Sequence, residues 1–196
     1  MFGFRLVKLL GVVSAAMLVL YGATVAGTAG GPDAVLRPRV LAIANPRVVV
    51  LKSRHLLYLL DGDEVVRSYH VDLGSSSFGP KERQGDRRTP LGSFRVVTKN
   101  RRSEYHRFIG IDYPDLPAVE RGLARGLISR GEAASLREAL AAGRCPDWAT
   151  ALGGGIGIHG GRKGTNWTAG CVAVSDAQIA ELFDVLRIGD PVEILP

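Results

Sequence analysis

Short apolar runs separated by polar or glycine-containing turns recur from Arg47 to the end of the chain, and they restrict the fold more than any other feature. The runs cover residues 48–51, 55–60, 64–73, 94–97, 156–159 and 192–195. Asp61-Gly62, between the second and third runs, is typical of a tight hairpin, because glycine supplies the positive φ that such a turn needs. No regular alternation of strand and long helix is visible. We therefore expect a mainly β sandwich or barrel.

Two segments are predicted to be helical from their capping residues. Ser129, with Glu132 three residues later, forms a capping box, so we expect a partly helical insert over residues 100–151. Ser175 and Gln178 form a second capping box, and the apolar residues that follow recur at helical spacing. This pattern predicts a C-terminal helix with one buried face, followed by a closing strand.

The N-terminal segment is predicted to direct export. Arg5 and Lys8 precede an uncharged stretch that is long enough to cross a bilayer as a helix and ends in small residues, as a signal-peptidase site does. Basic residues before the apolar stretch place the rest of the chain outside the cytoplasm. We expect a signal peptide or membrane anchor over residues 1–30, a linker over 31–46 and one folded domain over 47–196.

Charge and cysteine content narrow the possible partners. The formal net charge is +6, and the basic residues form no dense stripe interleaved with aromatic residues, so nucleic acid is not an expected partner. A mildly basic exported protein suits an anionic envelope polymer, and only the N-terminal segment is expected to contact a membrane. Cys145 and Cys171 are too few for a disulfide scaffold, and composition leaves open whether they pair with each other.

Residues 156–174, with the sequence I-G-I-H-G-G-R-K-G-T-N-W-T-A-G-C-V-A-V, contain the candidate catalytic chemistry. A strand ends at His159, a glycine-rich loop follows, and Gly170-Cys171 leads into a second apolar run. A neutral histidine can withdraw the proton of a nearby thiol, and a loop of this length costs little entropy to close. Because Gly170 permits unusual backbone angles, we expect the N–H groups of Gly170 and Cys171 to bind an oxyanion.

Other interpretations of the same residues stay open at this point. Cys171 can be a small buried apolar residue, and His159 can be structural. The pattern Gly155-x-Gly157-x-x-Gly160 formally matches a dinucleotide-binding motif, but it leads into a polar loop where that motif requires a helix. A zinc site would need more Cys or His residues at ligand spacing, so no metal is expected.

Two separated blocks of sequence also carry a family resemblance. One consists of His159-Gly160 followed by T-A-G-C at residues 168–171, and the other is G-D-R-R-T-P-L-G-S-F at residues 85–94. In this order they resemble the His-Gly and Ser/Thr-x-Gly-Cys signature and the upstream G-D-x-x-T-P-x-G-x-F/Y stretch of the L,D-transpeptidase (YkuD-type) catalytic domain. The resemblance covers roughly residues 47–196.

The resemblance implies the β fold of that family and cysteine acyl transfer on peptidoglycan in the bacterial envelope, in the periplasm, without metal or organic cofactor. Cys171 would attack the stem tetrapeptide at the carbonyl before its terminal D-Ala, and His159 would act as the base. The carbonyl of Gly160 would orient His159. The acyl group would pass to an amine: a neighbouring stem peptide, a lipoprotein lysine or a free D-amino acid.

Three residues are candidate substrate contacts: Trp167, Thr168 and Tyr113. Thr168 can instead shape the loop, Trp167 can fill the core, and Tyr113 can belong to a turn before a proline. Two positions depart from the family pattern. His or Lys is frequent where this chain has Ala169, and Arg is frequent where it has Ala173. Water as the acceptor would make the chain a carboxypeptidase or amidase. The alternative from another class is a non-catalytic wall-binding module.

Overall fold

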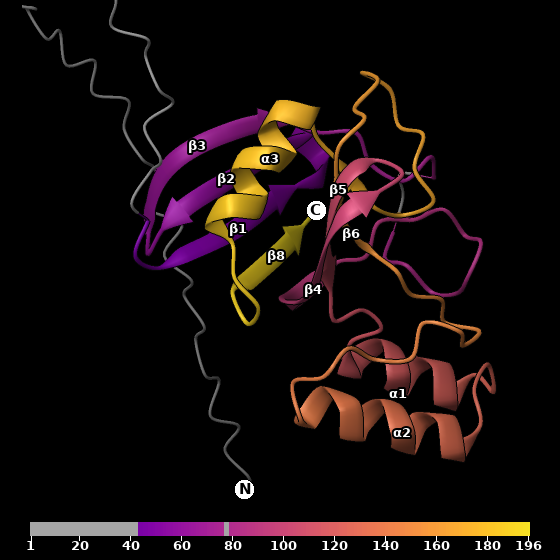
Figure 1. The fold of residues 1–196 in the computed structure, drawn as a ribbon. Coiled ribbons are helices and arrows are strands. Elements are labelled where there is room, and N and C mark those ends of the chain that lie inside the picture. The colour runs from indigo at the N-terminus through magenta and orange to yellow at the C-terminus, as the bar shows by residue number, and fades with distance from the viewer. Residues whose placement is uncertain (1–42, 77–78) are drawn as a thin grey trace, which may run out of the picture. The chain divides into compact units, whose positions relative to one another are not determined.

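The computed structural model describes residues 43–76 and 79–196 (Figure 1). The expected signal peptide or anchor over residues 1–30 lies outside the described residues, as does the expected linker up to residue 42. Within the described part of the chain, no helix combines the length and the apolar character that are needed to cross a membrane.

Eight strands form one curled sheet in the order β3-β2-β1-β8-β4-β5-β6-β7 (Figure 1). The strands are β1 (Pro46–Leu51), β2 (Leu56–Asp61), β3 (Glu64–His70), β4 (Gly92–Ser103), β5 (His106–Ile111), β6 (Gly157–His159), β7 (Val172–Ala173) and β8 (Pro191–Leu195), with a short 3-10 helix at Lys52–Arg54. The pairs β1–β8 and β6–β7 are parallel, and the other pairs are antiparallel. The mainly β fold is confirmed, with the closing strand β8 inserted between β1 and β4.

The predicted Asp61-Gly62 turn joins β2 to β3. Asp61 pairs with Glu64 across the turn, and Gly62 has a φ of 58°, a left-handed conformation that glycine adopts without a steric penalty. The Asp61 carboxylate also accepts a hydrogen bond of 2.8 Å from the backbone N–H of Asn45, just before β1. The turn therefore helps to set where the first strand enters the sheet.

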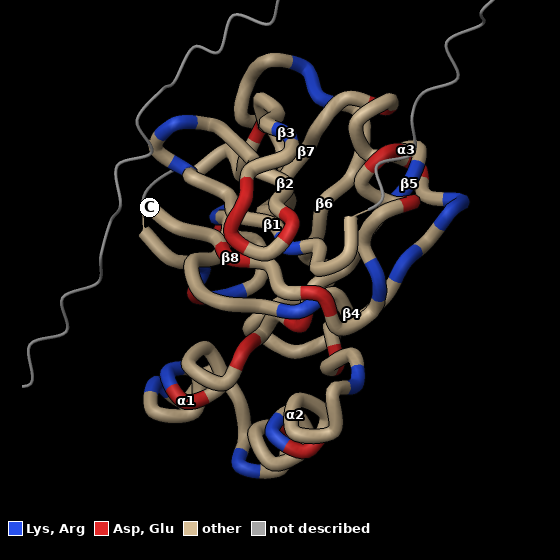
Figure 2. The backbone as a smooth tube through the Cα atoms, turned by 90° about the vertical axis from the view of Figure 1, so that its left-hand side faces the viewer, with Lys and Arg blue, Asp and Glu red and all other residues tan. Residues whose placement is uncertain are grey.

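The hairpin of β4 and β5 lies where the sequence predicted the start of an insert. Asn100 pairs with Phe108 across the hairpin, so the expected insert over residues 100–151 is strand as far as Ile111 and becomes helical only at Leu116. The outer part of β4 is exposed and rich in basic residues (Figure 2). It lacks the apolar alternation that identifies a strand in a sequence, because backbone pairing beyond the core forms it.

Two helices, α1 (Leu116–Ala124) and α2 (Arg130–Ala141), make up the helical part of the insert and lie together at one end of the domain, away from α3 (Figure 1). Ser129 and Glu132 form both hydrogen bonds of the predicted capping box at the start of α2. The shorter α1 was not predicted; Asp115 caps it by accepting a hydrogen bond of 3.1 Å from the N–H of Ala118. The pair has its own small core, formed by Val119, Ile128, Ala133, Leu136 and Leu152.

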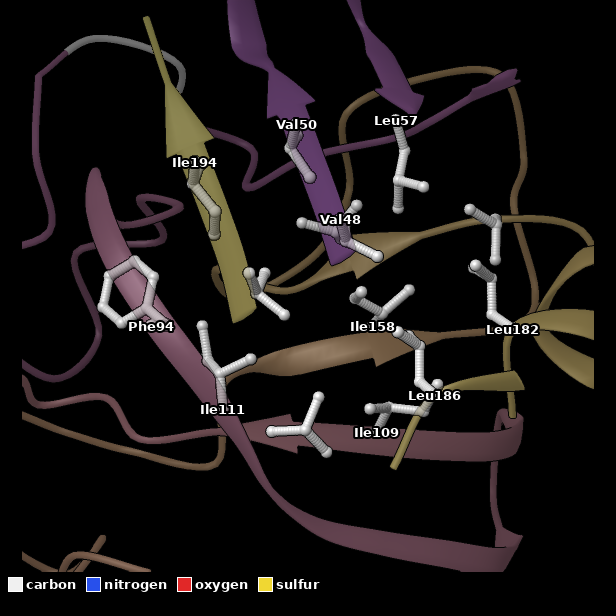
Figure 3. Packing of buried hydrophobic residues seen from close by; sticks show 14 of the residues in the cluster. Val48, Val50, Leu57, Phe94, Ile109, Ile111, Ile158, Leu182, Leu186 and Ile194 are labelled. Carbon is white, nitrogen blue, oxygen red and sulfur yellow. The ribbon is translucent and has the colours of Figure 1, made fainter. Parts of the chain in front are cut away.

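The C-terminal helix α3 (Asp176–Val185) begins at the second predicted capping box and packs against β5 and β6. Leu182, and Leu186 just after the helix, meet strand residues such as Ile109 and Ile158 in the main core (Figure 3). Each fully buried aliphatic side chain of this kind stabilises the fold by about 1.5–3 kcal/mol. This core holds β6 in place, and the candidate site lies at the end of β6.

Candidate active site

A pocket of about 380 Å³ lies between the β4–β5 hairpin, the end of β6 and the loop that leads to β7. Four residues that the sequence singled out line this pocket: Cys171, His159, Trp167 and Thr168. Tyr105 and Arg102, which the sequence did not single out, line it from the hairpin. The structure thus brings both halves of the predicted Cys/His pair to one cavity.

The parallel pairing of β6 with β7 explains why the two side chains share one face. His159 pairs with Ala173, and Cys171 precedes Ala173 by two residues. Successive side chains of an extended chain alternate between the two faces of a sheet, so residues two apart project from the same face. Cys171 and His159 therefore face the same side, although eleven residues separate them in the chain.

The imidazole of His159 is held by its own backbone neighbour. His159 is only 3% exposed, and its Nδ1 lies 2.7 Å from the carbonyl oxygen of Gly160. A carbonyl oxygen can only accept, so Nδ1 carries the proton and Nε2 keeps its lone pair. This geometry supplies the orienting contact that the resemblance assigned to Gly160, and it makes Nε2 the basic atom.

The thiol of Cys171 makes a different contact. Its Sγ donates a hydrogen bond of 3.5 Å to the carbonyl of Gly155, and among the described residues no hydrogen bond joins Sγ to His159. Hydrogen bonds between catalytic groups are often long before a substrate binds. Proton transfer to His159 therefore requires Sγ to exchange the Gly155 carbonyl for Nε2 of the imidazole.

Burial keeps both groups neutral. It raises the pKa of the Cys171 thiol to about 11, although a hydrogen bond from the Gly157 backbone and the charge of Lys81 act in the opposite direction. Burial also lowers the pKa of His159 below the usual 6.5, against the effect of its hydrogen bond to Gly160. Both shifts oppose transfer of the proton from this thiol to this imidazole in the resting site. The resting pair is therefore a thiol and a neutral imidazole.

The turn before Cys171 is closed by the hydroxyl of Thr168. This hydroxyl donates to the carbonyl of Cys171 at 2.8 Å and accepts from the N–H of Gly170 at 3.1 Å. In this structure the Gly170 N–H is bonded to Thr168, so its expected role as an oxyanion donor stays a prediction and requires that this bond be exchanged. The N–H of Cys171 stays a prediction as an oxyanion donor.

The two sequence blocks that suggested the family meet at Gly170. This glycine has a φ of 138°, and a Cβ at its position would lie 2.7 Å from the carbonyl oxygen of Arg88. Only glycine adopts this conformation readily and also leaves room for the approaching backbone. The upstream block, residues 85–94, thus packs directly against the turn that carries Cys171.

Two aromatic side chains, which also contact each other, pack against the imidazole. The ring of Tyr105 stacks on His159 with centroids 4.6 Å apart and an angle of 29° between the planes. Trp167 meets the His159 ring edge-on at 5.7 Å, and Lys163 Nζ lies 4.2 Å from the centroid of Trp167. Tyr105 is 43% exposed at the tip of the β4–β5 hairpin, and no sequence signal marked it, because its contact with His159 exists only once the sheet has formed.

Tyr113 lies elsewhere, which corrects its assignment as a substrate contact in the cleft. Its side chain is 1% exposed in the main core, where its ring packs edge-on against Phe94 and its hydroxyl donates to the carbonyl of Leu152 at 3.4 Å. The sequence placed it beside the insert, but the chain turns inward after β5. The large ring fills the space between the sheet and the insert.

Asp72 is a second residue that sequence reasoning missed. It is 2% exposed, and its carboxylate accepts hydrogen bonds from the N–H groups of Lys163 at 2.6 Å and Gly164 at 3.0 Å. Its backbone bridges to Ala173, and Arg162 Nε lies 3.4 Å from its other oxygen. Asp72 therefore fixes the loop between His159 and Cys171 from the side of β3.

A bound metal ion would need a cluster of ligand side chains among the described residues. Within residues 43–76 and 79–196, no group of three or more His, Cys, Asp or Glu side chains is arranged to hold a metal ion. Cys145 is exposed and Cys171 is partly buried, and both are free thiols. The expectation that the protein uses no metal or organic cofactor stays a prediction.

A thiol and a neutral imidazole thus line one pocket on one face of the curled β sheet. The sequence profile of the L,D-transpeptidase catalytic domain, YkuD, matches residues 45–194. The chain therefore belongs to the L,D-transpeptidase catalytic domain family. A search of the curated proteins found no match.

The chain is similar to several solved structures at low sequence identity. The helical cell shape determining protein Pgp2 from Campylobacter jejuni has a TM-score of 0.52 and 20% identity, covering 76% of this chain and 47% of that chain. Bd1075 from Bdellovibrio bacteriovorus has a TM-score of 0.50 and 19% identity, covering 79% and 49%. L,D-transpeptidase 1 from Mycobacterium tuberculosis has a TM-score of 0.45 and 19% identity, covering 78% and 62%. The chain spans less than two thirds of the length of each of these proteins.

Proposed function

We propose that this chain is a peptidoglycan L,D-transpeptidase in which Cys171 is the nucleophile and His159 is the general base. The observation that carries the proposal is the oriented, neutral imidazole of His159 beside the Cys171 thiol in one pocket of a member of this family. The donor substrate is a stem tetrapeptide that ends in D-Ala.

In the first half-reaction the thiol is acylated. Nε2 of His159 takes the proton of Cys171 as Sγ attacks the carbonyl carbon that precedes D-Ala, and the Cys171 N–H donates to the developing oxyanion. As the C–N bond breaks, the imidazolium returns its proton to the leaving amine. D-Ala departs, and a thioester links the shortened stem peptide to Cys171.

In the second half-reaction an amine attacks the thioester carbonyl and transfers its proton to His159, and the released thiolate of Cys171 then recovers that proton. The side-chain amine of a neighbouring stem peptide gives a 3–3 cross-link. A lipoprotein lysine gives an anchored protein, and a free D-amino acid gives exchange. Water as the acceptor would release a tripeptide, and this is one outcome of the test below.

The lining of the pocket supports a peptide with free carboxylates as the donor. The rings of Tyr105 and Trp167 lie 5.4 Å apart and both contact His159, so they offer a continuous apolar surface beside the imidazole, and Arg102 supplies a guanidinium at the rim. A guanidinium pairs readily with a carboxylate. Thr168 contributes mainly by holding the turn, because its hydroxyl already makes two backbone contacts.

The proposed reaction takes place outside the cytoplasm, where its polymeric substrate is found. The uncharged stretch after Arg5 and Lys8 supports export of the chain or its attachment to the membrane through this segment. Cell fractionation with a C-terminal tag would check the location, and recovery in the cytoplasm of a bacterial host would contradict it.

The test incubates the purified protein with tetrapeptide muropeptides that contain diaminopimelate and analyses the products by mass spectrometry. We expect loss of D-Ala together with a cross-linked dimer. Loss of D-Ala without a dimer, also when lipoprotein peptide or D-amino acid is added, would replace transfer by hydrolysis. Binding to the wall polymer without any release of D-Ala would favour the non-catalytic module and contradict the proposal.

The acid limb of the pH profile is expected below pH 6.5. Only neutral His159 can accept the thiol proton, and burial lowers its pKa, so kcat/KM for D-Ala release should persist to below pH 6.5 and then fall about tenfold per pH unit. A His159→Gln variant should be slower by about 10²–10⁴-fold and should lack this limb. An acid limb above pH 7, or the same limb in the Gln variant, would argue against His159 as the base.

A further inference from the structure

A buried ion pair lies near the nucleophile without lining its pocket. Lys81 is only 3% exposed, and its Nζ lies 2.8 Å from Oδ1 of Asp86 and 3.1 Å from the carbonyl oxygen of Arg83. Removing charged groups from water is costly unless they are paired and hydrogen-bonded. An exposed ion pair would have avoided that cost, so the position of this pair calls for a local role.

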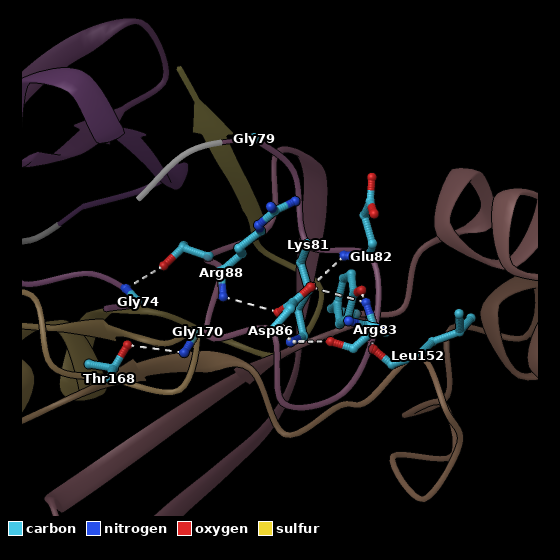
Figure 4. A network of polar contacts seen from close by, with 12 residues as sticks. Gly74, Gly79, Lys81, Glu82, Arg83, Asp86, Arg88, Leu152, Thr168 and Gly170 are labelled. Carbon is cyan, nitrogen blue, oxygen red and sulfur yellow. Dashed lines mark hydrogen bonds and ion pairs between the residues drawn. The ribbon is translucent and has the colours of Figure 1, made fainter. Parts of the chain in front are cut away.

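The Asp86 carboxylate organises the loop that surrounds it. Besides Lys81, it accepts hydrogen bonds from the backbone N–H groups of Glu82 at 2.7 Å, Arg83 at 3.0 Å and Arg88 at 3.0 Å (Figure 4). Burial raises the pKa of Asp86, but the hydrogen bonds outweigh it and lower the pKa overall, so the carboxylate is ionised at neutral pH. One charged group thus holds both ends of the loop.

This loop supports the turn that carries the nucleophile. Arg88 donates its backbone N–H to Asp86, and its carbonyl oxygen packs against Gly170. A Cβ added at Gly170 would lie only 2.7 Å from this oxygen. The next residue, Thr89, accepts a hydrogen bond of 2.9 Å from the N–H of Gly74. The chain of contacts therefore runs from Lys81 and Asp86 through Arg88 to Gly170, immediately before Cys171 (Figure 4).

We propose that Lys81 and Asp86 are positioning residues for Cys171: the pair fixes the Arg88 carbonyl against Gly170, and the ammonium provides a buried positive charge that favours the thiolate during attack. This inference rests on the proposed function, in which Cys171 is the nucleophile. A thiolate near a buried cation forms at a lower cost than one among apolar groups alone.

Among the charged side chains near Cys171, Lys81 is the one expected to stabilise the thiolate. Other titratable or charged side chains approach the site: His159 from β6, Arg102, Glu104 and Tyr105 from the hairpin, Lys163 from the following loop, and Asp86 and Arg88 from the loop behind Gly170. The hairpin and loop groups at the pocket are solvent-exposed, and water screens their charges. Lys81 is the charged residue that lowers the pKa of the Cys171 thiol, against the larger effect of burial.

The test measures the thiol directly, without any substrate. In the full-length protein with Cys145→Ala, so that Cys171 is the only thiol, the rate of alkylation by iodoacetamide is followed between pH 7 and pH 10, where the rate is proportional to the small fraction of thiolate. Lys81→Met keeps the length of the side chain and removes the charge, whereas Lys81→Arg keeps the charge and changes the shape. Arg125→Met is the matched control, because Arg125 is an exposed cation that pairs with Glu82 of the same loop.

Lys81→Met is expected to slow alkylation throughout this pH range by about 3–10-fold, because a rise of about 0.5–1 unit in the pKa of the thiol lowers the thiolate fraction by that factor. Lys81→Arg is expected to react at nearly the parent rate, and Arg125→Met should not change the rate. A parent-like rate in a folded Lys81→Met protein, or an equal slowing in Lys81→Arg, would overturn the inference. Because the readout needs no peptidoglycan, a failure of the proposed transfer reaction would be seen separately in the muropeptide assay.

Discussion

Replacing Cys171 with alanine is expected to reduce the release of D-Ala from tetrapeptide muropeptides by about 10⁴-fold or more. The proposed reaction passes through a thioester on Sγ, and no other group in the lining of the pocket offers an equivalent nucleophile. The side chain is small and only partly buried, so the variant should fold and lose at most about 1–2 kcal/mol of stability. Product analysis by mass spectrometry measures the loss, and intact-protein mass spectrometry should show an acylated enzyme only for the parent.

Cys145→Ala is the matched control for this prediction. Cys145 is a free, exposed thiol and does not line the pocket, so its removal should leave the rate and the acyl-enzyme unchanged. If Cys171→Ala retained more than about a tenth of the activity while Cys145→Ala lost it, the roles assigned to the two cysteines would be wrong.

The second large effect is expected from Gly170→Ala. At a φ of 138°, a non-glycine residue is strained, and the new Cβ would lie 2.7 Å from the Arg88 carbonyl and 3.0 Å from Cδ1 of Ile156. We expect a loss of about 2–4 kcal/mol in the free energy of unfolding, with a Tm lower by roughly 5–15 °C. The displaced turn should also reduce kcat/KM by about 10²-fold, because Cys171 follows directly.

Gly164→Ala is the matched control, because it introduces backbone strain at a positive φ without a steric contact of the new Cβ. Gly164 lies in the same loop and has a φ of 84°, but a Cβ there would meet no atom within 4 Å. It should lose about 1–2 kcal/mol through its backbone conformation alone and keep nearly parental activity. Equal losses of activity in the two folded variants, measured well below both Tm values, would show that the contact between Arg88 and Gly170 does not matter for the reaction.

Features encoded by neighbouring residues could be predicted from the chain. The capping boxes at Ser129 and Ser175 mark helix starts because each needs only a hydroxyl and a residue three positions later. The Asp61-Gly62 turn is predictable for the same reason. The mainly β fold followed from the short apolar runs and their turns, and the family followed from two short blocks of sequence. Both are confirmed, whereas the chemical roles of Cys171 and His159 stay predictions.

Features that depend on distant pairing could not be predicted in this way. The outer part of β4 is charged and exposed, so only its partner β5 makes it a strand. Tyr105, at the tip of that hairpin, stacks on His159 at the end of β6, and Tyr113 turns into the core although its sequence position suggested the cleft. The charged hairpin shows no apolar alternation, and the other two outcomes depend on residues far apart in the chain, so none of the three leaves a local pattern.

The same division holds for the chemistry of the site. The sequence singled out the thiol, the imidazole and the glycine before the cysteine as candidates, through their residue types and through the family resemblance. The tertiary structure decided that both groups rest neutral, that Thr168 occupies the N–H of Gly170, and that Lys81 and Asp86 support the turn from behind. The physical reason is that pKa values and hydrogen-bond partners depend on burial and on groups brought close by folding, and neither is written in the spacing of residues along the chain.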